Sequence, residues 1–210
     1  MQGERIYFQC GELRLEGILN RAEEQKGVVI THPHPLYGGD MHNNIVDSIA
    51  WAYQQRGFTT LRFNFRGVGA SHGSYDEGVG EQEDVAAAIN LLKSEGCDEI
   101  HLAGYSFGAW VIAQGLRQYE DCGYIVMVSP PTAFLDFSPN GPDPRIGLVI
   151  TGSHDDIAPP SMVRELVKEW NPEARLEIVQ GADHFYWGKE HLVSQAIEEY
   201  LSKKTGARRQ

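Results

Sequence analysis

The sequence predicts an α/β protein in which helices cover both faces of a mainly parallel, eight-stranded sheet. Short apolar runs alternate with longer stretches of helical periodicity along most of the chain. Strands that are short, apolar and separated by helices form parallel sheets that are buried on both sides. The chain has 210 residues, enough for one continuous core, and we expect residues 1–210 to form a single domain.

The first two apolar segments, residues 5–10 and 13–19, flank a Gly-Glu turn and are expected to pair as an antiparallel hairpin. The later predicted strands are residues 27–31, 59–65, 99–106, 124–130, 146–152 and 175–180. Helical spacing predicts helices at residues 43–57, 80–96, 107–119, 161–170 and 189–204. The Pro-rich segment 131–144 is too irregular for a helix and too short for a cap domain, so no cap is expected.

Composition restricts the kinds of partner. The formal net charge is −11, which repels phosphate backbones and anionic lipid head groups, so we expect neither nucleic acid nor membrane as a partner. The three cysteines show no Cys-x-x-Cys spacing, which favours a reducing compartment over a disulfide framework. The N-terminus lacks a signal-peptide core, and no apolar run approaches the roughly 18 residues of a membrane helix. A cytoplasmic protein is expected.

One motif indicates a catalytic nucleophile. Residues 104–108 read Gly-Tyr-Ser-Phe-Gly, a G-x-S-x-G placed between an apolar strand and an apolar helix. A nucleophile elbow needs this strand–turn–helix setting, because the turn is so tight that side chains two before and two after the serine would collide with neighbouring backbone. Without that setting, Ser106 would be an ordinary helix N-cap between turn glycines.

A serine hydroxyl needs a base, and the base needs an acid to orient it. In an elbow enzyme the acid and the histidine follow the serine in that order, each after a later strand. The segment "TGSHDD" offers Asp155 and Asp156 after one strand, and "GADHF" offers Asp183 and His184 after the last. Asp183 is the neighbour of His184, and adjacent side chains of an extended loop diverge, so Asp183 is expected to hydrogen-bond within its own loop.

At this point the chain resembles the small, uncapped α/β-hydrolases, both dienelactone-hydrolase-like and carboxylesterase-like members. It is most similar to a group of bacterial predicted hydrolases with five motifs in a fixed order. The corresponding stretches here are "HPHPLYGGDMHNN", "RFNFRGVGASHG", "AGYSFGA", "PPTAFLDFS" and "GADHF". The resemblance covers nearly the whole chain and implies an α/β-hydrolase fold and a Ser-Asp-His triad, but hardly any substrate.

The resemblance also assigns roles to residues. In the family pattern the acid stands three residues after the glycine that closes its strand, with a proline four residues beyond, and Gly152 and Pro159 both point to Asp155. Asp156 would then be a turn or helix-start acid. The implied triad is Ser106, Asp155 and His184, and one oxyanion-hole donor is the backbone N–H of Phe107.

The stretch "THPHPLYGG", residues 31–39, allows two interpretations. His32 and His34 could share a face and bind a metal, but no further ligands stand at a zinc-like spacing, and we expect no metal and no cofactor. The stretch could instead carry the second oxyanion donor. Proline has no N–H, which leaves the amide of His34 or of Leu36. His34 occupies the place that the superfamily's His-Gly loop uses, so the resemblance favours its backbone N–H.

Aromatic and apolar residues near these motifs are candidates for an acyl pocket, although they could equally pack in the core. They are Leu36, Tyr37, Tyr105, Phe185 and Tyr186. Arg66 could bind an anionic substrate, but a structural role is favoured because many α/β-hydrolases use a similar Arg-Gly loop structurally. The cysteines lack a neighbouring base and are expected to be inert.

The sequence therefore predicts a serine hydrolase that cleaves small or medium carboxylic esters or thioesters through an acyl-enzyme on Ser106. Its partner would be a small-molecule acyl substrate. An uncapped peptidase would use the same triad, a non-enzymatic binding module could keep the fold, and a metallohydrolase would need His32 and His34. The sequence leaves acyl length, leaving group and oligomeric state open.

Overall fold

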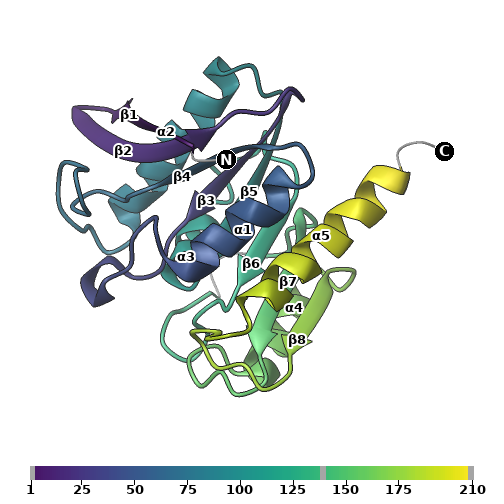
Figure 1. Ribbon diagram of the computed structural model, residues 1–210. Helices are drawn as coiled ribbons and strands as arrows, with labels where there is room; N and C mark the ends of the chain where they lie inside the picture. The colour runs from purple at the N-terminus through teal and green to yellow at the C-terminus, as the bar shows by residue number, and fades with distance from the viewer. Residues whose placement is uncertain (1–2, 138–140, 208–210) are drawn as a thin grey trace.

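A computed structural model describes residues 3–137 and 141–207. It contains one eight-stranded sheet in the order β1-β2-β4-β3-β5-β6-β7-β8 (Figure 1). The strands are β1 (Glu4–Cys10), β2 (Leu13–Asn20), β3 (Lys26–Thr31), β4 (Thr59–Phe63), β5 (Glu99–Tyr105), β6 (Ile125–Val128), β7 (Ile146–Gly152) and β8 (Arg175–Val179). All eight strands lie where the sequence predicts them, within a few residues at each end.

The sheet is parallel except at β2, which pairs antiparallel with both β1 and β4. The strand order reverses at β3, because the chain passes from β3 to β4 on one side and then to β5 on the other. The ends of β3 and β5 are in register, with Thr31 opposite Gly104. In parallel sheets ligands bind where the order reverses, outside the carboxyl ends of the strands. The loops after β3 and β5 leave the sheet at this point.

In the part of the chain that the structure describes, five α-helices cover the sheet. Helices α1 (Asn44–Gln54) and α5 (Glu190–Ala207) lie on one face, and α2 (Val79–Ser94), α3 (Phe107–Gln114) and α4 (Pro160–Trp170) lie on the other (Figure 1). The period of two along each strand explains the two cores: in β3, Val28 and Ile30 join the core under α1 and α5, whereas Val29 joins the opposite one. A short 3-10 helix, η1 (Pro35–Tyr37), follows β3.

Helix α3 is shorter than expected. It ends at Gln114, although the helical pattern extends to Tyr119. The reason is a close contact at Gly115, where an added Cβ would lie 2.2 Å from the Tyr119 hydroxyl oxygen. The buried Tyr119 ring folds back onto this turn, and its hydroxyl donates to the Gln82 carbonyl at 2.9 Å. Tertiary packing of one tyrosine therefore ends the helix early.

The segment 131–144 forms no helix or strand where it is described, as predicted, and its residues 138–140 lie outside the described residues. It is tied to the body of the fold at Asp136, whose carbonyl accepts hydrogen bonds from Trp110 Nε1 at 2.9 Å and Gln114 Nε2 at 3.0 Å. Both donors lie on α3, so this connection packs over the helix that follows Ser106.

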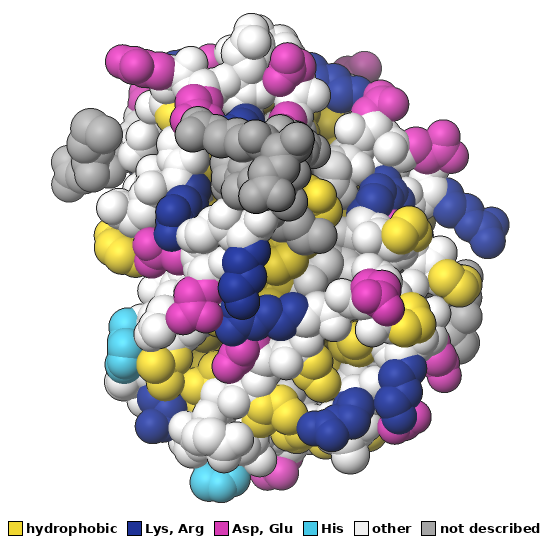
Figure 2. Space-filling view, turned by 90° about the vertical axis from the view of Figure 1, so that its right-hand side faces the viewer, with side chains coloured by type: hydrophobic (Ala, Val, Ile, Leu, Met, Phe, Trp, Pro, Cys, Tyr) yellow, Lys and Arg dark blue, Asp and Glu magenta, His cyan; other side chains and the backbone are white. Residues whose placement is uncertain are grey.

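Positive and negative side chains are interspersed on the face seen from the right-hand side of Figure 1, with separate hydrophobic side chains between them (Figure 2). Arg175 of β8 forms ion pairs with Glu177 on the same strand and with Glu199 of α5, and the second pair joins the strand to the helix. Among the described residues, none of the helices combines the length and the apolar character that crossing a membrane requires.

Candidate active site

Ser106 stands on a sharp turn between β5 and α3. Its backbone has φ 54° and ψ −118°, a conformation that costs a non-glycine residue energy and is held by the surrounding packing. Both flanking glycines are required sterically. A Cβ at Gly104 would lie 2.6 Å from the Ala109 nitrogen, and one at Gly108 would lie 2.6 Å from Thr31 Oγ1. The collisions expected from the G-x-S-x-G motif are therefore present, and the turn has the geometry of a nucleophile elbow.

A chain of hydrogen bonds runs from Ser106 to His184 and on to Asp155. Ser106 Oγ lies 2.9 Å from His184 Nε2, and His184 Nδ1 lies 3.0 Å from each carboxylate oxygen of Asp155. An ionised carboxylate can only accept, so Nδ1 carries the proton and Nε2 is the acceptor for the serine hydroxyl. Three residues from the ends of β5, β7 and β8 thus meet, although 78 positions separate Ser106 from His184.

Asp155 is 2% exposed and is held as a carboxylate by several donors. Its Oδ1 accepts the backbone N–H groups of Ile157 at 2.9 Å and Ala158 at 2.7 Å, and its Oδ2 accepts the Ser129 hydroxyl at 2.7 Å. Burial by itself raises the pKa of Asp155, but the hydrogen bonds from His184, Ala158 and Ser129 outweigh it and hold the pKa below its usual value. The neighbouring Asp156 is exposed.

Ser129 is a site residue that sequence reasoning missed. It follows β6 with φ 45°, and its hydroxyl lies 2.7 Å from both Asp155 Oδ2 and the Tyr186 hydroxyl. Because the carboxylate can only accept, Ser129 donates to Asp155, and Tyr186 must donate to Ser129. The sequence did contain a signal. Ser129 follows β6, Asp155 follows β7, and the ends of these neighbouring parallel strands lie at the same edge of the sheet.

Two of the five pocket candidates are core residues. Tyr186 is 0% and Tyr105 2% exposed. Tyr186 has φ 55°, which turns its ring inward beneath Asp155, and burial raises its pKa well above the usual value. The Tyr105 hydroxyl donates to the His184 carbonyl oxygen at 2.8 Å and so holds the histidine loop. Of the two interpretations left open for these rings, packing in the core is the one the structure supports.

The other pocket candidates are solvent-exposed. Leu36 is 68%, Tyr37 87% and Phe185 52% exposed. Leu36 and Tyr37 lie in η1 after β3, and Phe185 directly follows His184 and contacts its ring, with ring centroids 5.7 Å apart. Trp187, two residues after Phe185 in the same loop, is 73% exposed. Large apolar side chains are therefore exposed to solvent on both loops that flank Ser106, the loop after β3 and the loop after β8.

Two backbone amides near Ser106 are available as donors. The Phe107 N–H belongs to the first turn of α3, where no acceptor exists within the helix. In the loop after β3, Leu36 N–H already donates to His34 Nδ1 at 3.2 Å. The following amides, of Tyr37, Gly38 and Gly39, donate to backbone carbonyls. Of the two amides that the sequence left as candidates, only that of His34 has no acceptor among the described residues.

The remaining residues singled out from the sequence have structural partners. The Asp183 carboxylate accepts the N–H groups of Phe185 at 3.0 Å and Tyr186 at 3.1 Å, as a loop hydrogen-bonder does. Arg66 binds the buried Asp84 through Nε and Nη2 and so ties its loop to α2. The three cysteines are free and buried, and burial raises the thiol pKa of Cys10 and of Cys122 to about 11. These contacts leave Arg66 and the thiols away from the chemistry.

Metal binding was the other interpretation of residues 31–39. Both ring nitrogens of His32 are engaged by backbone groups, Nδ1 with the Pro33 carbonyl and Nε2 with the Phe65 N–H. Within residues 3–137 and 141–207, no cluster of three or more His, Cys, Asp or Glu side chains is close enough to hold a metal ion. His32 would have to give up a backbone partner to become a ligand.

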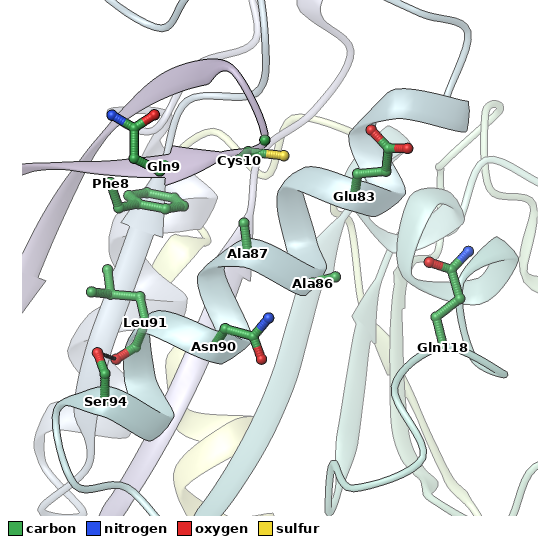
Figure 3. Close-up of a pocket in the computed structure, with 11 residues that line it drawn as sticks. Phe8, Gln9, Cys10, Glu83, Ala86, Ala87, Asn90, Leu91, Ser94 and Gln118 are labelled. Carbon is green, nitrogen blue, oxygen red and sulfur yellow. Dashed lines mark hydrogen bonds between the residues drawn. The ribbon is translucent and has the colours of Figure 1, made fainter.

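A groove of about 620 Å³ lies elsewhere, between the edge strand β1 and helix α2 (Figure 3). Phe8, Ala87 and Leu91 form apolar parts of its lining, and Glu83 and Asn90 are polar. Its lining includes none of the residues that bond around Ser106, so the candidate site is the strand-end cluster and not this groove.

Comparison with known proteins places this geometry in a family. The family model described as "Alpha/beta hydrolase family" matches residues 28–147. The chain belongs to the α/β-hydrolase family. The match includes β3 through β6 and the elbow, and the sheet order and helix placement of this α/β-hydrolase are those of the family's fold. The fold class that the sequence predicts is confirmed.

Solved structures resemble the chain over nearly its full length. A serine hydrolase homologue from Coxiella burnetii is 32% identical, with TM-score 0.89, covering 96% of this chain and 98% of the other. A protein of unknown function from Agrobacterium tumefaciens is 35% identical, with TM-score 0.90, covering 97% of each chain. A serine hydrolase without a lid from Xanthomonas campestris is 29% identical, with TM-score 0.89, covering 97% and 95%. This α/β-hydrolase thus shares its overall fold with bacterial relatives over nearly the full length of each chain.

Proposed function

We propose that this α/β-hydrolase is a serine hydrolase that cleaves carboxylic esters or thioesters of small to medium acyl groups. The observation that carries the proposal is the hydrogen-bond chain from Ser106 through His184 to Asp155, with its two junctions at 2.9 Å and 3.0 Å. Nucleophile, base and orienting acid are thus within reach of one another before any substrate arrives. The similarity to serine hydrolases from Coxiella burnetii and Xanthomonas campestris supports the same reaction class.

The first half-reaction transfers the acyl group to the enzyme. Ser106 Oγ attacks the acyl carbon while its proton passes to His184 Nε2, and the electron pair of the C=O bond moves onto oxygen. Asp155 stabilises the resulting imidazolium through Nδ1–H and keeps the ring in the tautomer that can accept. When the tetrahedral intermediate collapses, the C–O or C–S bond breaks and His184 returns the proton to the leaving alcohol or thiol.

The developing oxyanion needs donors, and the Phe107 and His34 amides supply them. A Cβ at Gly108 would lie 2.7 Å from the His32 carbonyl oxygen, so the first turn of α3 packs directly on the loop after β3. The rings of His34 and Phe107 lie 4.7 Å apart between centroids. Because these two segments are in contact, we expect both amides to act on one oxygen, and each such donor contributes roughly 10²–10³ in kcat.

The second half-reaction releases the acid. A water molecule occupies the place of the leaving group and gives its proton to His184 Nε2 as its oxygen attacks the acyl-enzyme carbon. The same two amides stabilise the second tetrahedral intermediate, which collapses to free acid and returns the proton to Ser106. The exposed Leu36, Tyr37 and Phe185 offer apolar surface to the acyl group or the leaving group, which favours apolar esters over charged ones.

Covalent labelling tests the proposal directly. A fluorophosphonate probe should label the wild-type protein at Ser106, and Ser106→Ala should abolish both labelling and turnover of chromogenic esters and thioesters. Ser161→Ala, which removes an exposed serine on α4, is the matched control and should label like wild type. A folded wild-type protein that neither labels nor cleaves any acyl substrate would instead be a binding module.

The same panel separates esterase from peptidase. Including aminoacyl-arylamides beside esters of increasing acyl length measures both activities on the same preparation. We expect turnover of short and medium esters or thioesters and none of the arylamides. Cleavage of the arylamides without ester turnover would contradict the proposal in favour of a peptidase that uses the same residues.

A further inference from the structure

The side chain of His32 takes no part in the proposed reaction, yet it is 0% exposed and both of its ring nitrogens are hydrogen-bonded. Its Nε2 lies 3.1 Å from the Phe65 nitrogen, and its Nδ1 lies 2.6 Å from the Pro33 carbonyl oxygen. The Phe65 N–H can only donate, so Nε2 is the acceptor. Nδ1 therefore carries the proton and donates to the Pro33 carbonyl. The backbone at the end of β4 thus selects the tautomer of a ring that lies in the loop after β3.

The ring keeps this role at neutral pH. Burial lowers the pKa of His32 to about 4, against weaker opposing effects of the Pro33 hydrogen bond and the charge of Asp40. The imidazole is therefore neutral, with one donor and one acceptor, across the range in which a serine hydrolase works. Its Nδ1–H bond to Pro33 is a permanent part of the fold.

The Pro33 carbonyl belongs to the same peptide unit as the His34 N–H. The described peptide bonds are all trans, and in a trans peptide the C=O and the N–H point in opposite directions. A ring that holds the Pro33 oxygen on its own side therefore directs the His34 N–H away from itself. The side chain of His32 and the amide of His34 act on opposite edges of one planar group.

Gly39 also packs against the Pro33–His34 peptide. A Cβ added at Gly39 would lie 2.1 Å from the Pro33 carbonyl oxygen and 2.8 Å from that of His34. The Gly39 N–H also donates to the His34 carbonyl oxygen at 3.0 Å. The chain thus folds back against the Pro33–His34 peptide, and it can do so only because residue 39 has no side chain.

We propose that His32 is a positioning residue whose imidazole, with Gly39 behind the same peptide, fixes the His34 N–H as an oxyanion donor. This inference rests on the proposed function, since it assigns a cause to the geometry of that oxyanion hole. The two histidines of residues 31–39 then have different roles: the buried His32 orients the peptide, and His34 supplies the amide.

Two isosteric variants separate the two bonds of the ring. In His32→Asn the side-chain NH2 takes the place of Nδ1 and can still donate to the Pro33 carbonyl, but the Phe65 N–H loses its acceptor. In His32→Gln the side-chain carbonyl takes the place of Nε2, and the donor to Pro33 is lost. Each variant removes one hydrogen bond from a buried site, so their stabilities should fall by similar amounts and only their catalysis should differ.

For each variant, kcat and KM are measured separately on a short chromogenic ester. The fold and the melting temperature are measured on the same preparation. We expect His32→Gln to lose about 10²-fold in kcat with KM within about threefold, approaching the loss of one oxyanion donor. His32→Asn should retain kcat within about tenfold of wild type. Equal losses in the two variants, or a larger loss in His32→Asn, would overturn the inference.

Gly39→Ala keeps the inference testable if the His32 variants fail to fold. It leaves both histidines in place and displaces the Pro33 oxygen, and it should lower kcat at least about tenfold while KM changes little. A folded Gly39→Ala with wild-type kcat contradicts the inference. A wild-type protein that neither turns over esters nor labels at Ser106 defeats the proposed function itself, and the two failures are thereby distinguished.

Discussion

Two regions of this α/β-hydrolase meet at Ser106, and they differ in whether side chains or a backbone N–H would take part in the reaction. In the proposed reaction the acid–base half, which consists of Ser129, Asp155, His184 and Tyr186, supplies side chains, and these are held by other side chains and by two amides. The β3 loop, residues 32–39, offers a backbone N–H and holds it with a side chain, two prolines and a glycine. Each region uses one part of the chain for chemistry and the other part for support.

The contrast predicts that the two regions tolerate different changes. In the acid–base half, a substitution that preserves backbone but alters a carboxylate or imidazole removes the working group. In the β3 loop, a side-chain truncation at His34 leaves the working amide intact, whereas a change that removes or turns the amide destroys it. The two regions should therefore respond in opposite ways to side-chain and backbone substitutions.

The largest effect is expected in the acid–base half. Asp155→Asn should lower kcat by about 10⁴-fold, because an amide no longer holds His184 in the accepting tautomer. Asp156→Asn, at the exposed neighbour, should leave kcat near wild type and is the matched control. Steady-state kinetics on a short ester decides between them, and the reverse ranking would move the acid by one position.

The next effect tests the β3 loop. His34 has φ −57° and ψ 123°, a backbone that proline adopts without strain, so His34→Pro removes the N–H while keeping the conformation. We expect kcat to fall by about 10²–10³, the loss of one oxyanion donor. His34→Ala removes the ring and keeps the amide, and it should retain most of the activity.

The His34 pair also tests the contrast between the regions. If His34→Ala loses as much activity as His34→Pro, the ring of His34 works in the reaction, and the β3 loop resembles the acid–base half after all. Circular dichroism and melting temperature on both variants separate a lost donor from a lost fold.

The smallest effect concerns the support of Asp155. Because hydrogen bonds hold its folded pKa below the unfolded value of 3.8, the carboxylate stabilises the fold above that value, and the contribution is lost as pH falls through the folded pKa. Ser129→Ala removes one of those bonds and raises the folded pKa. At pH 7 the variant should be less stable by about 1.5–3 kcal/mol, the contribution of a hydrogen bond to a charged group.

Urea unfolding of wild type and Ser129→Ala from pH 7 down to pH 2, below the usual pKa of an aspartate, measures this. The difference in the free energy of unfolding should shrink as the pH falls, because both proteins then approach a protonated Asp155. A difference that stays constant with pH would show that Ser129 does not bond the charged carboxylate.

Sequence alone predicted much of this molecule. Alternating apolar and helical patterns placed all eight strands, because a parallel sheet buried on both faces leaves a strong local signature. The elbow was predictable for a similar reason, since its two glycines and its strand–turn–helix setting are all within a few residues of Ser106. The order of Asp155 and His184 after the elbow follows from topology, and the family resemblance favoured Asp155 over Asp156.

Contacts between distant strand ends were not predictable in this way. The position of Ser129 after β6 indicates only the edge of the sheet at which it lies, and no local pattern indicates that its hydroxyl meets that of Tyr186, 57 positions away. Whether Tyr186 lines a pocket or fills the core depends on its φ of 55°, which the neighbouring loop imposes. The early end of α3 likewise depends on where the Tyr119 ring packs.

Residues 31–39 show which properties the sequence determined and which ones depended on the tertiary structure. By itself the sequence determined that Pro33 and Pro35 have no N–H, so only His34 or Leu36 could offer an amide. The family resemblance favoured His34. Only the tertiary structure showed that the Leu36 N–H is already satisfied by an acceptor on His34, and that His32 is buried between the Pro33 carbonyl and the Phe65 amide. The physical reason is that covalent structure fixes which donors exist, whereas packing across the sheet fixes which of them are already satisfied.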